Sequence, residues 1–139
     1  MSGERYFLDT AFVPALLNRR DQFHPQARAF LARVRTAVEV WITEAVLVEI
    51  GNALSARNRI AAAKFVRECY ETSNMRVVAV DTVLVQRALD HYEVRPDKDW
   101  GLTDCISFVV MKDKDLAEAV TSDSHFQQAG YRARLVEQS

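Results

Sequence analysis

Short apolar segments with the composition of β-strands alternate with amphipathic helical segments along the whole chain. The strands are predicted at residues 5–8, 38–42, 76–80, 119–121 and 133–136. Between them, apolar residues recur at spacings of three and four, as in Ala27, Phe30, Leu31 and Val34. This alternation predicts a three-layer α/β domain, in which a mostly parallel central sheet is flanked by helices.

The composition is that of a globular protein with its own core. A length of 139 residues fits one domain, and we expect a single domain over residues 1–139. No apolar run approaches the roughly 20 residues of a membrane-spanning helix, and the amino terminus lacks a signal-peptide pattern. Two isolated cysteines, Cys69 and Cys105, lie in apolar helical patterns. We therefore expect a reduced, cytoplasmic protein with no membrane partner.

Two acids lie between residues 100 and 126 where the predicted structure changes from one element to the next. Asp104 follows Gly101 at the start of an apolar helical run, and Asp123 follows the strand at 119–121. In parallel sheets, ligands bind outside the carboxyl ends of the strands, where helix amino termini also present N–H groups. Asp is also a common helix cap. Each acid alone has that structural interpretation, but the pair indicates a cation site.

Two further acids occupy comparable positions in the first half of the chain. Asp9 ends the first strand and precedes a helix, so its structural alternative is again a cap. Glu49 borders the apolar face of the predicted helix that carries Val46 and Ile50. A Glu side chain is rarely buried without a partner. Its alternative is a solvated position at the edge of that face. Asn52, one turn later, is a candidate to steady the Glu49 carboxylate.

The chemistry of this acid set points to a divalent cation. Carboxylates gathered in one pocket raise one another's pKa, and a cation relieves their repulsion. Oxygen ligands favour Mg²⁺ or Mn²⁺ over zinc, and the chain's histidines lack the spacing of a zinc-binding pair. Such a site hydrolyses a phosphate ester with a metal-activated water. The predicted catalytic and metal-binding residues are Asp9, Glu49, Asp104 and Asp123.

The acids lie in four short motifs: Leu8-Asp9-Thr10, Val48-Glu49-Ile50-Gly51-Asn52, Leu102-Thr103-Asp104-Cys105 and Thr121-Ser122-Asp123-Ser124-His125-Phe126. In order and spacing they resemble the motifs of PIN-domain nucleases, most of all the VapC-type toxins of bacterial toxin–antitoxin pairs. The resemblance covers nearly the whole chain. It implies a parallel sheet between helices, four acids that hold Mg²⁺ or Mn²⁺, and cleavage of single-stranded regions of RNA. It also implies a partner antitoxin that covers the site.

The resemblance, together with the strongly apolar early helices, also implies a homodimer with an apolar groove for the antitoxin. One alternative is a catalytically silent PIN-like module that binds RNA or protein. Another is a phosphotransfer domain, either a receiver or a haloacid-dehalogenase-type phosphatase. The sequence argues against the phosphatase because Ala11 occupies the second acidic place of Asp-x-Asp, and against the receiver because it lacks paired early acids.

The basic and aromatic residues near these motifs have two interpretations each. A positive cluster either holds RNA phosphates or covers solvated helix surfaces: Arg19, Arg20, Arg28, Arg57, Arg59 and Lys64. Trp100 and Phe126 either stack on unpaired bases or belong to the core or a partner contact. His125 either assists proton transfer near neutral pH or is an exposed or capping residue. With a formal net charge of −1, the whole protein does not attract nucleic acid by its charge.

Overall fold

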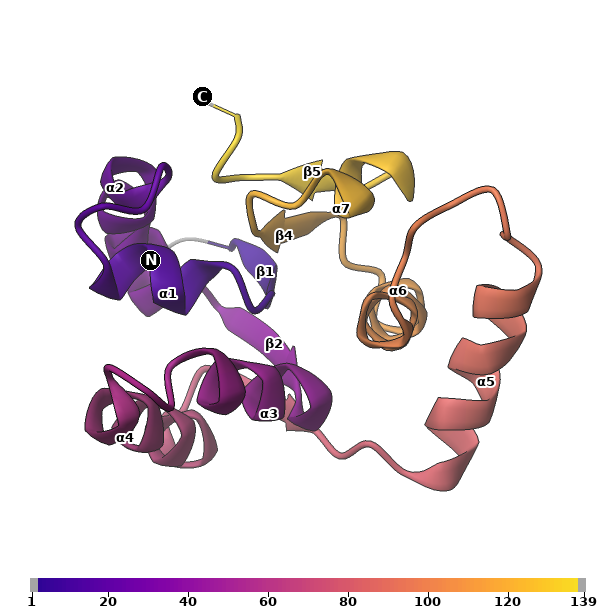
Figure 1. Ribbon diagram of the computed structural model, residues 1–139, viewed down its shortest axis with the longest axis horizontal. Helices are drawn as coiled ribbons and strands as arrows, with labels where there is room; N and C mark the ends of the chain where they lie inside the picture. The colour runs from indigo at the N-terminus through magenta and orange to yellow at the C-terminus, as the bar shows by residue number, and fades with distance from the viewer. Residues whose placement is uncertain (1–2, 138–139) are drawn as a thin grey trace.

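The centre of the molecule is a five-stranded sheet whose strands all run parallel (Figure 1). The computed structural model describes residues 3–137. The strands, in chain order, are β1 (Arg5–Leu8), β2 (Glu39–Thr43), β3 (Met75–Val78), β4 (Glu118–Val120) and β5 (Arg132–Ala133). In space their order is β3-β2-β1-β4-β5. This arrangement confirms the three-layer α/β prediction.

Helices connect the strands and cover the sheet. They are α1 (Phe12–Leu17), α2 (His24–Thr36), α3 (Glu44–Ala53), α4 (Arg59–Glu71), α5 (Thr82–Glu93), α6 (Leu102–Asp113) and α7 (Ser124–Gln128). Figure 1 shows the pair α1 and α2 on the left, the pair α5 and α6 on the right, and the strands between them. Side chains cap the first turns of α3 and α5. Thr43 accepts the N–H of Val46 at 3.2 Å, and Asp81 accepts the N–H of Leu84 at 2.8 Å.

The strand order places a topological switch point between β1 and β4. From β1 the chain adds β2 and then β3 on one side, and later returns to add β4 and β5 on the other. The register pairs Leu8 with Val120, so β1 and β4 end level with each other. In open parallel sheets, ligands bind in the crevice outside the carboxyl ends of the strands at such a point. A ligand site is therefore expected at the residues that follow Leu8 and Val120.

Two strands end two or more residues earlier than the sequence predicts. The expected strand at 133–136 stops at Ala133, because the N–H of Val136 donates to the Ala133 carbonyl in a turn at 3.1 Å. The expected strand at 76–80 stops at Val78. The N–H of Val80 donates to the Glu44 carboxylate at 3.3 Å instead of to a neighbouring strand. Both ends are set by contacts that a propensity argument does not include.

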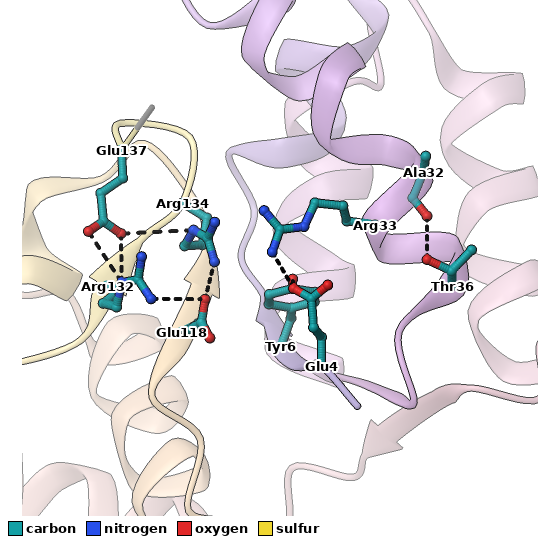
Figure 2. A network of polar contacts seen from close by, with 9 residues as sticks. All are labelled: Glu4, Tyr6, Ala32, Arg33, Thr36, Glu118, Arg132, Arg134 and Glu137. Carbon is teal, nitrogen blue, oxygen red and sulfur yellow. Dashed lines mark hydrogen bonds and ion pairs between the residues drawn. The ribbon is translucent and has the colours of Figure 1, made fainter. Parts of the chain in front are cut away.

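A network of ion pairs covers the end of the sheet away from this switch point (Figure 2). Glu4 precedes β1 and accepts from Arg33 and from the Tyr6 hydroxyl, whereas Glu118 begins β4 and accepts from Arg134. The Arg134 side chain is only 5% exposed. Its guanidinium lies over the Phe30 ring, 5.2 Å from the centroid. The buried arginine therefore connects the segment after β5 to both β4 and α2.

Cys69 and Cys105 are both free and buried, as expected for residues in apolar helical patterns. Within residues 3–137, no helix has the length and apolar character needed to cross a membrane.

Candidate metal centre

Three of the four predicted acids lie near the carboxyl ends of β1 and β4, where Asp104 and Asp123 form a close group and Asp9 is near enough to feel their charges. Asp9 directly follows β1, Asp104 lies in the first turn of α6, and Asp123 caps α7 after β4. Ligand atoms of Asp104, Asp123 and His125 all lie within 4.8 Å of one another. The charges of Asp104 and Asp123 also raise the pKa of Asp9. The cluster therefore lies at the switch point, where the topology favours ligand binding.

Asp9 is the buried member of the cluster, with only 5% of its surface exposed. Burial is the main cause that raises the pKa of its carboxyl from 3.8 to about 7, and the charges of Asp104 and Asp123 add to it. The Thr121 hydroxyl opposes the shift by donating to Asp9 Oδ2 at 2.8 Å. The same hydroxyl accepts the N–H of Asp123 at 3.0 Å. Thr121 thus fixes two of the acids relative to each other.

His125 joins the other two acids. Its Nδ1 atom lies 2.8 Å from Asp104 Oδ2 and 3.4 Å from Asp123 Oδ1. Asp104 Oδ2 also accepts the N–H of Gly101 at 3.2 Å. Burial raises the pKa of Asp104 and the charge of Asp123 adds to it, although the bonds from His125 and Gly101 oppose the rise. Burial lowers the pKa of His125, but the hydrogen bond to Asp104 and the nearby carboxylates outweigh it, so the net shift is upward.

Asp123 can cap a helix and bind a cation at the same time. Its Oδ1 atom accepts the N–H of His125 at 2.9 Å and so caps α7. Asp104 is not the N-cap of α6, because Gly101 occupies that position. A carboxylate that accepts one backbone N–H still has lone pairs for a cation. Capping therefore does not remove either acid from the cluster.

Glu49 is exposed on α3 and is not one of the residues that form the close group of Asp104, Asp123 and His125. Its Oε1 atom accepts the Thr10 hydroxyl at 2.7 Å, and Thr10 directly follows Asp9. The residue that steadies Glu49 is therefore Thr10, whereas the candidate Asn52 accepts from Ser55 with its backbone carbonyl. Glu49 is exposed to solvent, as its alternative interpretation predicted. Its role in the site stays a prediction.

The structure settles the aromatic alternatives. Trp100 is 5% exposed and Phe126 is fully buried, so the interpretation that they stack on unpaired bases is wrong. The Trp100 ring stacks on His91 at 5.4 Å, and its Nε1 donates to Gln128 at 3.1 Å. Phe126 packs edge-to-face against Phe108 at 5.0 Å. Both aromatics support the elements that carry the acids.

The six basic residues of the predicted cluster are all exposed. Lys64 lies 3.9 Å from Glu68, and Arg59 donates to the Ser55 carbonyl at 3.2 Å. These contacts are those of ordinary solvated helix surfaces. An RNA-binding role for the cluster stays a prediction.

The donor atoms of the cluster fit a divalent cation. The side chains supply carboxylate oxygens, which are the ligands that Mg²⁺ and Mn²⁺ prefer. Burial raises the pKa of Asp9 most and the neighbouring carboxylates add to it, so a bound cation would favour its charged form. His125 adds one imidazole nitrogen to the set. The sequence pattern missed this contact because His125 has no second histidine at a zinc-binding spacing. Its place two residues after Asp123 is the only local signal.

Comparisons with known proteins agree with this architecture. The sequence model of the PIN domain matches residues 6–130, and the chain therefore belongs to the PIN domain family of metal-dependent nucleases. A solved structure with the same fold is the Mycobacterium tuberculosis toxin VapC20, which cleaves the sarcin–ricin loop. The two chains are 26% identical with a TM-score of 0.80, and the match covers 92% of this chain and 96% of VapC20. No curated protein sequence matches the chain significantly.

Proposed function

We propose that this protein is an endoribonuclease that uses Mg²⁺ or Mn²⁺ to hydrolyse RNA phosphodiester bonds, and that it is the toxin of a toxin–antitoxin pair. The observation that carries the proposal is the close group of Asp104, Asp123 and His125 at the switch point of the sheet, with the buried Asp9 linked to it through Thr121. The family and the similarity to an RNA-cleaving toxin support the same activity. The proposed place of action is the cytoplasm.

The acids and their neighbours would have different roles at this site. Asp9, Asp104 and Asp123 would hold the cation, and Thr121 links the Asp9 carboxylate to the backbone of Asp123. A bound divalent cation lowers the pKa of water and screens the negative charge of a phosphate. Glu49, exposed and held by Thr10, completes the ligand set or orients the attacking water. As a ligand it would give a lone pair of its second oxygen to the cation, and in the other role that oxygen would accept a hydrogen bond from the water.

The alternative function is a catalytically silent module that binds RNA or protein. A binding module has no need to bury a carboxylate beside two others, because that arrangement costs folding free energy. The retained acids therefore favour the enzyme.

An antitoxin partner and a homodimer are part of the proposal. A cavity of about 320 Å³ opens between α1, α2 and α4, and it is lined by apolar side chains that include Leu16, Leu31 and Phe65. This cavity fits an apolar segment of the antitoxin. Large exposed apolar side chains on α3 to α5 support the dimer: Val48, Ile60, Tyr70 and Val83. A strictly monomeric species in light scattering at micromolar concentration would count against the dimer.

The activity is tested with chelator-stripped protein and end-labelled single-stranded RNA. We expect no cleavage in the chelator and defined fragments after Mg²⁺ or Mn²⁺ is added, with single-stranded DNA of the same sequence as the control substrate. RNA binding without cleavage under every metal condition would favour the silent module instead.

A further inference from the structure

The imidazole of His125 lies where a metal ligand would lie. Its Nδ1 atom is 2.8 Å from Asp104 Oδ2 and 3.4 Å from Asp123 Oδ1. Two ligands at right angles on a cation with bonds of about 2.1 Å are themselves about 3 Å apart. The two observed separations lie on either side of that value. The nitrogen is therefore spaced from each of the two oxygens like a neighbouring ligand of one ion, and ligand atoms of all three residues lie within 4.8 Å of one another.

The backbone holds the imidazole in this place. The N–H of His125 donates to Asp123 Oδ1 at 2.9 Å, so the first turn of α7 fixes the residue beside the acid. The side chain is 26% exposed, and those of Asp104 and Asp123 are 16% and 34% exposed. The group is thus partly shielded and still open to an ion from solvent. A histidine that only capped the helix would need no contact from its ring to either carboxylate.

We propose that His125 supplies a nitrogen ligand to the metal centre, so that this protein binds Mn²⁺ in preference to Mg²⁺. The inference rests on the metal site of the proposed function and departs from the all-oxygen ligand set that the sequence predicts. Mg²⁺ is bound almost entirely by oxygen, whereas imidazole nitrogen is a common ligand of first-row transition metals. One nitrogen among the donors therefore shifts the balance toward Mn²⁺.

A rival role for His125 is to hold Asp104 by a hydrogen bond without touching the ion. That role makes Asp104 a better ligand for either metal, so its loss weakens Mg²⁺ and Mn²⁺ equally. A nitrogen ligand affects Mn²⁺ more, and it couples magnetically to the manganese electron spin. The two roles differ in a measurement that does not depend on RNA cleavage.

The test uses chelator-stripped wild type, His125→Gln, His125→Asp and the control His24→Gln. His24 lies at the start of α2, where Nδ1 is 2.8 Å from the Ala15 carbonyl oxygen. Free Mn²⁺ is counted by its electron paramagnetic resonance signal, Mg²⁺ affinity is measured by competition, and pulsed spectra report nitrogen coupled to bound Mn²⁺. Circular dichroism checks that each variant is folded.

We expect nitrogen coupling in the wild type and in His24→Gln, and none in either variant of residue 125. The ratio of Mn²⁺ to Mg²⁺ affinity falls by about 10-fold in His125→Gln, the size of change typical for residues that support a metal. His125→Asp keeps a ligand but replaces nitrogen by oxygen, so it still binds metal. Wild-type protein without nitrogen coupling, or equal losses of both affinities, would overturn the proposal. Nitrogen-coupled Mn²⁺ in a protein that cuts no RNA would refute the proposed function alone.

Discussion

Burying Asp9 among acids makes the metal-free protein less stable as pH rises. The pKa of Asp9 is raised in the folded state from 3.8 to about 7, mainly by burial. Below pH 3.8 the carboxyl is neutral in both the folded and the unfolded chain, and its contribution to stability is fully present. As pH rises toward 7, the unfolded chain ionises first and stability is lost. The raised pKa values of Asp104 and His125 act in the same direction.

The magnitude follows from the size of the shift. A rise of about three pKa units corresponds to at most about 4 kcal/mol, of which about 3 kcal/mol is lost between pH 5 and pH 8. Asp9→Asn removes this contribution, because an amide does not titrate and its oxygen still accepts from Thr121. We therefore expect the variant to be more stable than wild type at pH 8.

The assay is urea unfolding at 25 °C in a chelator at pH 5 and pH 8. The control is Asp90→Asn, which makes the same chemical change at an exposed position on α5. Wild type and the control should lose stability between the two pH values, whereas Asp9→Asn should lose clearly less. A flat or rising wild-type profile, or the same loss in Asp9→Asn as in wild type, would refute this account of Asp9.

Three further substitutions test the neighbours of the site and the far end of the sheet. Thr121→Val removes the donor to Asp9, so the pKa of Asp9 should rise further and the loss of stability between pH 5 and pH 8 in urea unfolding should steepen. Thr10→Val frees Glu49 and should slow RNA cleavage by about 10-fold with an unchanged thermal midpoint; a wild-type rate would contradict this role. Arg134→Met removes one partner of a buried ion pair and should cost about 3 kcal/mol in urea unfolding, while cleavage in the surviving folded protein stays unchanged.

The sequence predicted the parts of the site that follow from strand and helix order. Asp9 and Asp123 each follow a short apolar strand, and the parallel sheet brings those strand ends together. It did not predict the contact between His125 and Asp104, because the direction of a ring depends on how α7 packs on α6. It also did not show that Thr10 would hold Glu49, since that bond joins residues far apart in the chain.

The fold shows the same difference: element order could be predicted from the sequence, whereas contacts between distant residues could not. Alternating apolar strands and amphipathic helices were enough to predict three layers and a parallel sheet. The burial of Trp100 could not be predicted locally, because it depends on contacts with His91 from α5 and Gln128 from α7. The early end of β5 depends on a turn at Val136 that its β-type composition does not signal.

The central claim is that the clustered acids hold a metal for RNA hydrolysis, and Asp104→Asn and Asp123→Asn test it most directly. Cleavage of labelled RNA in Mg²⁺ and the thermal midpoint in chelator are measured on the same preparations. We expect both variants to lose cleavage, because an amide is a much poorer ligand than a carboxylate, with midpoints equal to or above that of wild type. A pure capping role predicts full activity, and wild-type cleavage rates in both variants would contradict the claim.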